Sequence, residues 1–217
     1  MFTGIVQTTA PLIGLDARAR PARVSVDLGE LARQVARGDS VALDGCCLTA
    51  TRIDPAGPVT FDAIPETLSR TTLGGRRRGY RFNVELAVTP TTRLGGHFVQ
   101  GHVDGVGTVT ESRDAGGQWR IAVRCDRALT DTMAPKGSVA LGGVSLTLTE
   151  VDHGRFAVAL IPATLEETNL RELRPGDAVN VETDMILKFV ARRLGMQRGG
   201  QSESTLTEGF LSDHGFC

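Results

Sequence analysis

The sequence predicts an all-β protein built from two tandem antiparallel barrels, and two observations lead to this prediction. First, Ser40–Thr49 recurs as Ser138–Thr147 with seven of ten positions identical, so one module is written twice. Second, most of the chain consists of short runs rich in Val, Leu, Thr and Phe between Gly, Pro and Asp, which is typical of strands joined by turns. A closed barrel is favoured over an open sheet because closure removes exposed sheet edges.

The repeat extends beyond this segment and sets the domain organisation. Asn83-Val-Glu85 recurs as Asn180-Val-Glu182, at an offset of 97. A period this long, present in two copies, is too large for a solenoid and indicates a duplicated domain. We therefore expect a first barrel in 1–97, a second barrel in 98–183, a helix in 184–195 and a mobile, polar tail in 196–217.

Strands are expected where β-branched and aromatic residues gather between turn residues. The expected strands span residues 40–51, 59–64, 82–88, 103–111, 119–125, 138–151, 156–161 and 178–183. Glycines inside or beside these runs suit bulges or tight barrel corners. They stand at positions 45, 105, 107, 142 and 143.

Short helices are expected between the strands. Residues 27–37 predict a helix that stops at Gly38. Single helical turns after prolines are expected at 66–70 and 166–168.

The strongest helical pattern covers residues 184–194, which Asp184 caps and Gly195 ends. Its apolar residues fall on one face. We expect this face to pack on the parent domain, with an oligomer contact as the alternative. The face consists of Ile186, Phe189, Val190 and Leu194.

The charge balance and the cysteine pattern exclude several classes of protein. The net charge is −1, so neither a nucleic acid nor a membrane partner is expected. The N-terminus lacks a signal-peptide pattern, and no apolar run approaches membrane-spanning length. Cysteines stand at 46, 47, 125 and 217 without a Cys-x-x-Cys pair, which predicts neither a metal site nor a disulfide framework. We expect a soluble, cytoplasmic protein with free thiols.

The segment between the modules, Gly95–Gly105, is rich in glycine and contains His97 and His102. His102 aligns with Ile5 of the first copy, so the two copies differ here. Two histidines five apart without carboxylates make a poor zinc site. His102 is therefore either part of a glycine-rich linker or a proton shuttle, since imidazole titrates near neutral pH.

Cys47 and Thr49 share one strand face, and Ser145 and Thr147 occupy the same places in the second copy. Outward-facing polar residues are the commoner case. Retention of small polar groups in both copies instead favours an inward, ligand-facing role. Residues 46 and 47 point to opposite faces, so one is expected in the core and the other at a site.

Basic residues carry less information. Lys136 stands where the first copy has Gly38, and Arg76–Arg78 lies in a Gly-flanked turn. Single lysines and short basic runs in a near-neutral chain are usually solvated.

Seven segments, in this order, together resemble the riboflavin synthase family over residues 1–195. The combination is specific, whereas any one segment is not. The segments are Met1–Val6, Gly45–Thr49, Gly95–His102, Lys136-Gly137, Gly143–Thr147, Leu160–Pro162 with Thr164, and Asp184.

The resemblance implies two six-stranded antiparallel Greek-key β-barrels, a C-terminal α-helix and a homotrimer assembled through that helix. It implies a transferase in which two molecules of 6,7-dimethyl-8-ribityllumazine exchange a four-carbon unit. The products are riboflavin and 5-amino-6-(ribitylamino)uracil, and no metal or redox cofactor takes part. In the family, donor and acceptor meet between the first barrel of one subunit and the second barrel of its neighbour, which holds two rings in reacting register.

The resemblance also implies two substrate pockets. The first-barrel pocket is expected to contain Gly4, Ile5, Val6, Ser40, Cys47, Leu48, Thr49, Asp62, Ala63, Ile64, Pro65, Glu66 and Thr67, with Phe2 closing it. The second is expected to contain Gly101, His102, Val103, Lys136, Ser145, Leu146, Thr147, Leu160, Ile161, Pro162 and Thr164.

Catalytic roles follow as hypotheses. His102 and Thr147 would assist deprotonation of a substrate methyl group, and Cys47 or a bound water would add to the acceptor ring. Lys136 would offset developing negative charge, and Asp184 would orient neighbouring polar groups. The expected catalytic set is Phe2, Cys47, His102, Lys136, Ser145, Thr147 and Asp184.

The chain departs from the family pattern at Gly142, where an acidic residue is usual, although its counterpart Asp44 is present. The change either weakens substrate orientation or catalysis, or alters only a turn. Three other functions are compatible with the same scaffold. They are a non-catalytic lumazine- or flavin-binding protein, an enzyme making another product from the same lumazine, and a structural barrel that forms oligomers.

Overall fold

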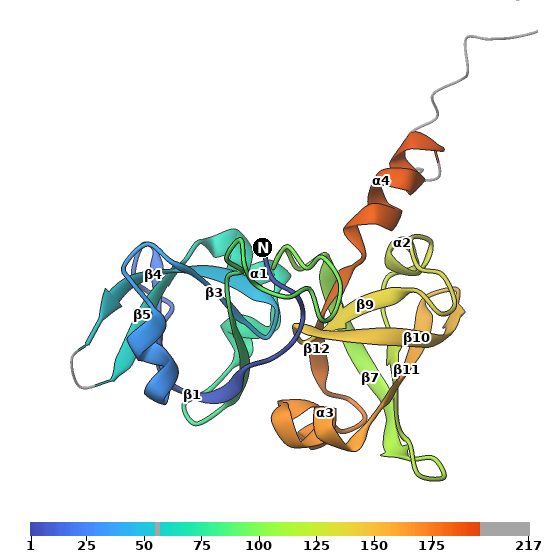
Figure 1. The fold of residues 1–217 in the computed structure, drawn as a ribbon, viewed down its shortest axis with the longest axis horizontal. Coiled ribbons are helices and arrows are strands. Elements are labelled where there is room, and N and C mark those ends of the chain that lie inside the picture. Colours follow the sequence, from blue (N-terminus) through green and yellow to red (C-terminus); the bar gives the residue numbers. More distant parts are fainter. Residues whose placement is uncertain (55–56, 196–217) are drawn as a thin grey trace, which may run out of the picture.

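The computed structural model describes residues 1–54 and 57–195, which form two closed barrels lying side by side with one helix projecting from them (Figure 1). The first barrel consists of β1 (Thr8–Asp16), β2 (Ala22–Asp27), β3 (Ser40–Leu43), β4 (Cys46–Ile53), β5 (Pro58–Ala63) and β6 (Arg81–Leu86). The second consists of β7 (Gly105–Asp114), β8 (Trp119–Arg124), β9 (Ser138–Leu141), β10 (Val144–Asp152), β11 (Arg155–Leu160) and β12 (Ala178–Thr183).

The two barrels share one topology. The hydrogen-bonded order is β1-β2-β5-β4-β3-β6 in the first, and the second repeats it with β7 in the place of β1. All strand pairs are antiparallel, and irregularities in pairing recur at matching places in both copies. They lie between residues 12 and 14, 50 and 52, 109 and 111, and 148 and 150. The predicted pair of six-stranded antiparallel barrels is confirmed.

The glycines at 45, 142 and 143 make hairpin turns rather than bulges. Asp44-Gly45 joins β3 to β4, and Gly142-Gly143 joins β9 to β10, all four with positive φ. This conformation matches the right-handed twist of the flanking strands. The two turns also meet back to back, because a Cβ at Gly45 would lie 2.8 Å from Gly143 Cα.

Two strands, β1 and β2, were not predicted. Pro11 and Gly14 interrupt the pattern of β1, and proline within a run argues against a strand. In the barrel, Pro11 pairs with Arg81 of β6 nonetheless. The short β2 was obscured because its last residue, Asp27, also begins a run with helical spacing.

Short helical pieces connect the strands. They are the 3-10 helices η1 (Gly29–Gln34), η2 (Thr72–Gly75) and η3 (Asn169–Glu172), and the α-helices α1 (Pro65–Arg70), α2 (Arg127–Thr130) and α3 (Pro162–Glu167). The helical turn predicted at 66–70 is confirmed as α1. The helix predicted over 27–37 forms only as the shorter η1, and its first residue, Asp27, belongs to β2 instead. The turn predicted at 166–168 is misplaced, since α3 begins at Pro162 and Thr168 caps η3.

The last helix, α4 (Met185–Arg193), forms as predicted. Asp184 Oδ1 accepts a hydrogen bond from Ile186 N at 2.8 Å, and Gly195 follows the helix with φ +66°. Lys188 Nζ, 2.8 Å from Asp104 Oδ2, ties the helix to the second barrel.

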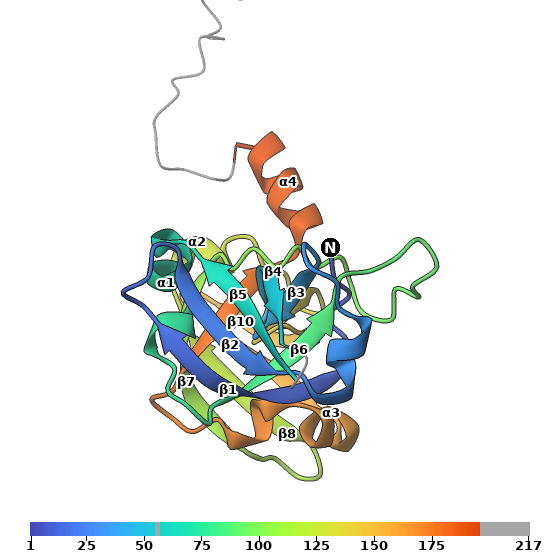
Figure 2. The same cartoon turned by 90° about the vertical axis from the view of Figure 1, so that its left-hand side faces the viewer.

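The apolar face of α4 does not pack on the parent domain, and that prediction is wrong. The helix projects from the barrels in both views (Figures 1 and 2). Ile186 is 55%, Phe189 61%, Val190 46% and Leu194 65% exposed. The tail predicted at 196–217 lies outside the described residues.

Each barrel has its own apolar core. Phe61 and Phe82 are fully buried in the first, and Phe156 and Ile121 in the second. A third, smaller cluster lies between the barrels and consists of Phe2, Ala42, Val99 and Ala140. The barrels are therefore packed together as well as joined by a linker.

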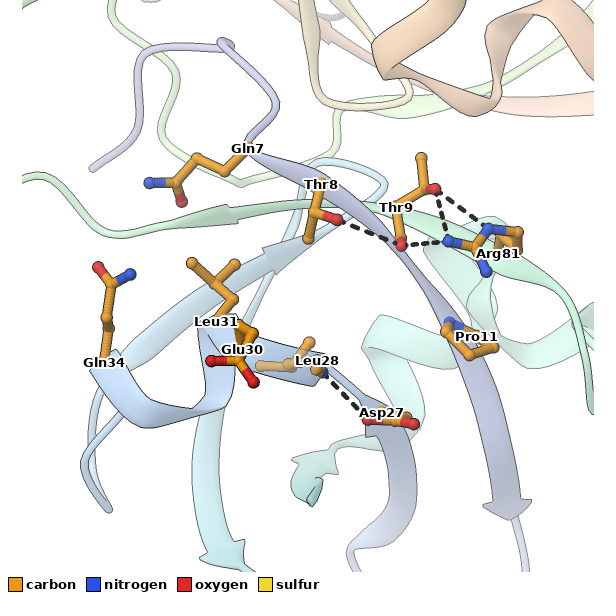
Figure 3. Close-up of a pocket in the computed structure, with 11 residues that line it drawn as sticks. Gln7, Thr8, Thr9, Pro11, Asp27, Leu28, Glu30, Leu31, Gln34 and Arg81 are labelled. Carbon is orange, nitrogen blue, oxygen red and sulfur yellow. Dashed lines mark hydrogen bonds between the residues drawn. The ribbon is translucent and has the colours of Figure 1, made fainter.

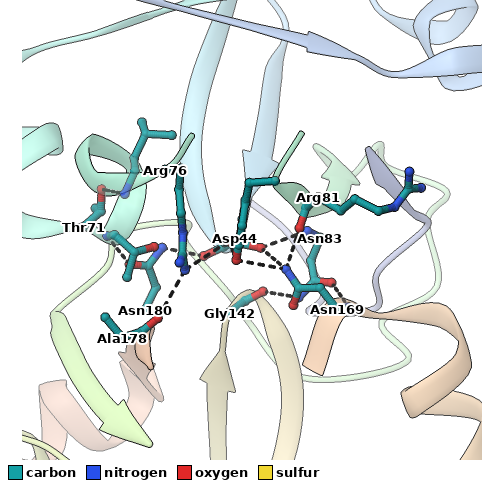
Figure 4. Close-up of polar contacts among 12 residues, drawn as sticks. Asp44, Thr71, Arg76, Arg81, Asn83, Gly142, Asn169, Ala178 and Asn180 are labelled. Atoms are coloured by element: carbon teal, nitrogen blue, oxygen red, sulfur yellow. Dashed lines mark hydrogen bonds and ion pairs between the residues drawn. The ribbon is translucent and has the colours of Figure 1, made fainter. Parts of the chain in front are cut away.

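Reciprocal polar contacts relate the two barrels by an approximate two-fold axis. Asn83 Nδ2 donates to Gly142 O at 2.9 Å, and its counterpart Asn180 Nδ2 donates to Asp44 O at 2.9 Å (Figure 4). Exchange of equivalent contacts in this way is the property of an isologous interface.

One side of this interface carries an additional charged centre. Asp44 Oδ1 accepts from Asn83 N and Asn169 Nδ2, both at 2.9 Å, and Oδ2 accepts from Tyr80 Oη at 2.8 Å. Arg76 stacks on the Tyr80 ring and lies 3.9 Å from the carboxylate. Burial raises the pKa of Asp44, while these donors and Arg76 act in the opposite direction.

Gly142 occupies the equivalent place on the other side. A Cβ there would face Asn83 at 3.4 Å, Leu170 at 3.6 Å and Val179 at 3.7 Å. None of these belongs to a predicted pocket. The nearest neighbours of Gly142 therefore belong to the contact between the barrels, as those of Asp44 do.

Candidate functional site

The segments that precede the two barrels cross each other at the two-fold axis. Phe2 N donates to Val99 O at 2.7 Å, and Val99 N donates to Phe2 O at 3.1 Å. Beyond this short antiparallel bridge, the N-terminal segment lies against the second barrel and the linker segment lies against the first.

The linker segment covers the first barrel's repeated strand. Cys47 N donates to Gly101 O at 2.9 Å, and Val103 packs against the first core. A Cβ at Gly101 would lie 2.6 Å from Cys47 Cβ, and φ is +78°. Only glycine permits this approach.

The N-terminal segment covers the second barrel's repeated strand in the same way. Ser145 N donates to Gly4 O at 2.7 Å, and Val6 packs against the second core. The predicted grouping is therefore wrong for both segments. Residues 4–6 belong with Ser145, and residues 101–103 belong with Cys47.

Two carboxylates that were not predicted as site residues hold the crossing segments. Glu85 accepts from Thr3 N at 2.6 Å and Gly4 N at 2.9 Å. Glu182 accepts from Gln100 N at 2.6 Å and Gly101 N at 3.0 Å. Burial raises the pKa of both carboxyls, to about 7 for Glu182. The repeat of Asn-Val-Glu in both copies is the sequence feature that could have pointed to these two carboxylates.

The first site is a pocket of about 380 Å³ beside β4. Ile64 and Thr67 line it from the start of α1, and Gly101, His102 and Val103 line it from the linker. Cys47 lines it from β4, and Glu66 also contributes. His102 is exposed, so its imidazole is accessible from solvent.

The repeated polar pairs point away from the barrel interiors, and the predicted inward orientation is wrong. Cys46 and Leu48 fill the first core, while Cys47 is half-buried and Thr49 exposed. Burial raises the pKa of the Cys46 thiol to about 12. Cys46 is thus the core cysteine, and Cys47 lies on the outer wall of the barrel beneath a crossing segment.

The second site repeats this arrangement with different side chains. Ser145 and Thr147 share the outer face of β10, and Ile161 and Thr164 flank the start of α3 as Ile64 and Thr67 flank α1. His97, not predicted as a site residue, places Nδ1 2.7 Å from Ser145 Oγ.

Several predicted binding residues serve the barrel cores instead. Their side chains are less than a tenth exposed and pack inside, so only their backbone is available at a site. They are Leu48, Ala63, Leu146 and Leu160. Asp62 accepts a hydrogen bond from Thr51 at 3.3 Å, and Pro65 and Pro162 begin α1 and α3.

Three further predicted residues, Phe2, Ser40 and Asp184, do not line the first-site pocket. Phe2 is buried and stands behind Gly101 on the side of the first site. Ser40 pairs with Thr49 and lines a larger groove of about 720 Å³ together with Ile5. Asp184 caps α4.

Lys136 is exposed, and its backbone has φ +67° where the first copy has a glycine, Gly38, at +98°. The two residues make the same contact, because Lys136 N donates to Leu148 O and Gly38 N to Ala50 O. A lysine in the left-handed region is unusual, since side chains other than those of Gly, Asn and Asp seldom adopt it.

A further pocket, of about 520 Å³, lies on the outer wall of the first barrel between β1, η1 and Arg81 (Figure 3). Arg81 is held by Thr9, whose carbonyl oxygen accepts at 2.6 Å. No residue of the predicted sites lines it. Within residues 1–54 and 57–195, no helix is long and apolar enough to cross a membrane, and no three His, Cys, Asp or Glu side chains are placed to hold a metal ion.

Comparison with known proteins finds one domain family twice in this chain. The lumazine binding domain matches residues 3–87 and again residues 100–184. A riboflavin synthase of Bacillus subtilis is 35% identical over 216 residues and covers both chains fully. One from Mycobacterium tuberculosis is 37% identical over 196 residues, covering 88% of this chain and 97% of its own.

Solved structures agree on the fold. A crystal structure of LumP complexed with riboflavin has a TM-score of 0.77 at 25% identity, covering 84% of this chain and 99% of LumP. Duplicated lumazine binding domains, together with relatives of this identity over the whole length, show that the chain belongs to the riboflavin synthase family.

Proposed function

We propose that this chain catalyses the reaction of riboflavin synthase, in which two molecules of 6,7-dimethyl-8-ribityllumazine give riboflavin and 5-amino-6-(ribitylamino)uracil. The observation that carries the proposal is one architecture built twice, with Cys47 in one copy and Ser145 in the other. A reaction between two identical molecules with opposite roles requires two similar sites that differ in reactive groups. The four-carbon unit leaves one molecule and joins the other, so the equation balances without an oxidant or reductant.

The first site suits the acceptor. Cys47 is half-buried in the pocket that His102 also lines. We infer that Cys47, or a water held there, adds to the acceptor ring and that His102 moves protons to and from a substrate methyl group. Thr67 and Ile64 bound the ring on the α1 side.

The second site suits the donor. Ser145 and Thr147 offer two hydroxyls on one face, and we infer that Thr147 assists methyl deprotonation. Lys136 offsets negative charge as it develops. A lysine kept in a left-handed turn, where the first copy has glycine, supports a role beyond solvation.

We infer a homotrimer assembled through α4. Phe189 and Val190 lie on its largely exposed apolar face, which does not pack on the described part of its own chain. Burial of such a face stabilises an assembly. In a trimer, the first site of one subunit would face the second site of its neighbour, which would stack the two rings in reacting register.

We further infer a cytoplasmic enzyme with a domain boundary near residue 97, as the repeat predicts. Because the two segments cross, each barrel has part of its site built by the segment that precedes the other barrel. The first site is complete only with residues 101–103 of the linker, and the second only with residues 4–6.

The experiment is to incubate metal-free protein with 6,7-dimethyl-8-ribityllumazine alone and to follow both products. We expect riboflavin and the pyrimidine in equal amounts. Accumulation of a different product would favour a specialised enzyme on the same scaffold.

The second candidate is a non-catalytic lumazine- or flavin-binding protein, favoured by the likeness to LumP. Tight, fluorescent binding without turnover would establish it. Both of this chain's sites keep polar pairs and an accessible crossing segment, which favours the enzyme.

A further inference from the structure

His97 lies in the linker between the barrels and contacts the reactive strand of the second site. Its Nδ1 is 2.7 Å from Ser145 Oγ, a short distance for a neutral hydrogen bond. The side chain is only 9% exposed. The imidazole is therefore a fixed part of the wall behind Ser145.

The backbone around His97 holds the ring in place. His97 N donates to Thr3 O at 3.1 Å. The preceding Gly96 leaves no space for a side chain, because a Cβ there would overlap Thr3 O and lie 2.8 Å from Ser145 Oγ. The contact with Ser145 is therefore built by the crossing segments and does not depend on a free rotamer.

The ring's hydrogen bonds indicate which nitrogen carries the proton. Burial lowers the pKa of His97 below its ordinary value, with the Asp184 carboxylate acting in the opposite direction, and this favours the neutral ring. Its Nε2 is buried and has no partner within the described part of the chain. A buried N–H without a partner is rarer than a buried acceptor without one. The proton is therefore assigned to Nδ1, which donates to Ser145 Oγ.

This assignment sets the direction of the Ser145 hydroxyl. A hydroxyl that accepts from the imidazole keeps its own proton to donate elsewhere. Ser145 faces outward with Thr147, on the side where a ligand would bind.

The first site has no such arrangement. Cys47 N is bonded to Gly101 as Ser145 N is bonded to Gly4. Among the described residues, however, no imidazole is hydrogen-bonded to the Cys47 thiol. The imidazole contact is thus a property of one site only, and it distinguishes two sites whose backbones match.

We propose that His97 is a positioning residue that turns the Ser145 hydroxyl toward the second site, as a hydrogen-bond donor to an oxygen or ring nitrogen of the bound lumazine. The proposal rests on the proposed function, since it takes the lumazine as ligand.

A double-mutant cycle tests it. His97→Leu and Ser145→Ala should each lower kcat/KM for the lumazine roughly tenfold, the equivalent of one neutral hydrogen bond to the bound molecule. The double variant should be no slower than Ser145→Ala, because both changes remove one interaction. His153→Leu, in the exposed turn between β10 and β11, is the matched control and should keep wild-type rates.

Two conservative variants separate positioning from packing. His97→Asn places an amide nitrogen near the position of Nδ1 and should recover most of the lost rate, whereas His97→Gln places it near Nε2 and should not. This pair decides the matter if His97→Leu fails to fold, as judged by thermal unfolding.

Additive losses in the cycle, or equal rates for the Asn and Gln variants, would overturn the role of His97. Failure of the proposed function is a separate result, because the wild type would then form no riboflavin. In that case the riboflavin affinity of the two single variants and of the double variant would be measured by fluorescence titration instead of the rates. Non-additive weakening would support the positioning role, and unchanged affinity in both single variants would overturn it.

Discussion

At the scale of single residues, Glu182 links the protonation of a buried carboxyl to the shape of the first site. Burial raises its pKa to about 7, although Gln100 N and Gly101 N donate to it. A carboxyl whose pKa is higher in the folded than in the unfolded chain stabilises the fold fully below its ordinary pKa of 4.5. That contribution is lost as the pH rises through about 7.

We therefore expect the free energy of unfolding of the wild type, relative to Glu182→Gln, to fall between about pH 4.5 and 7 and then to level off. The size should be on the order of 1–3 kcal/mol, since one pKa unit corresponds to about 1.4 kcal/mol. Urea titrations at several pH values measure it. Glu167→Gln, on the exposed side of α3, is the control. A difference that rises over this range would show that the two amides keep the carboxylate charged.

Gly101 makes a second residue-scale prediction. A side chain there meets Cys47 Cβ at 2.6 Å and Phe2 Cε2 at 2.8 Å, on a backbone with positive φ. Gly101→Ala should lower the free energy of unfolding by about 2 kcal/mol or more and weaken riboflavin binding at the first site. Gly14→Ala, at an open position, should change neither by comparison. Thermal unfolding and fluorescence titration give both quantities, and unchanged binding in Gly101→Ala would argue against a linker-built site.

At the scale of elements, β4 shows how strand alternation divides two adjacent cysteines. Cys46 points into the core, where burial raises its pKa to about 12, and Cys47 points into the pocket. The reactive form of a thiol is the thiolate. Iodoacetamide should therefore label Cys47 at least roughly tenfold faster than Cys46. Peptide mass spectrometry measures this, and riboflavin should protect Cys47. Faster labelling of Cys46 would contradict the assignment of faces.

The helix α4 shows which part of an amphipathic pattern a sequence determines. Asp184 and Gly195 set its ends locally, and these were predicted. What its apolar face contacts depends on other surfaces, and the prediction of packing on the parent domain was wrong.

For the proposed trimer, Phe189→Glu should give a monomer in sedimentation velocity and lower kcat by more than tenfold, because donor and acceptor would no longer meet. Arg192→Glu, on the same helix and also exposed, is the control for added negative charge. A monomeric wild type of full activity would exclude the assembly.

At the scale of the whole molecule, the contact between barrels is a polar interface of reciprocal asparagines with one buried carboxylate. Asp44 accepts hydrogen bonds from both barrels, through Asn83 and Asn169 (Figure 4). Its removal leaves several donors without an acceptor, which costs more than the bonds themselves contribute.

We expect Asp44→Ala to lower the free energy of unfolding by about 2–4 kcal/mol, and Asp44→Asn by less, since one oxygen acceptor remains. Asp and Asn adopt the positive φ of 46° at this position more readily than most residues do, so the Asn variant also controls for backbone strain. Urea unfolding measures the change. Equal losses in the two variants would mean that the carboxylate charge, rather than its hydrogen bonds, holds the interface.

The sequence by itself determined the duplication, the barrel class, α4 with its cap, and the polar pairs Cys47/Thr49 and Ser145/Thr147. These features are local or periodic, so spacing and residue type suffice to predict them. It did not reveal β1, because Pro11 interrupts a pattern that barrel closure nonetheless pairs.

Only the tertiary structure decided which segment serves which site. The crossing at Phe2 and Val99 places Gly4 on Ser145 and Gly101 on Cys47, and it brings His97 to Ser145. Alignment of the repeats matches each segment to its own barrel, because a repeat contains no information on exchange across a two-fold axis. The exchange follows from the burial of Phe2 and Val99 between the barrels and from the hydrogen bonds that Glu85 and Glu182 accept from backbone amides. All of these contacts join residues about 80 positions or more apart.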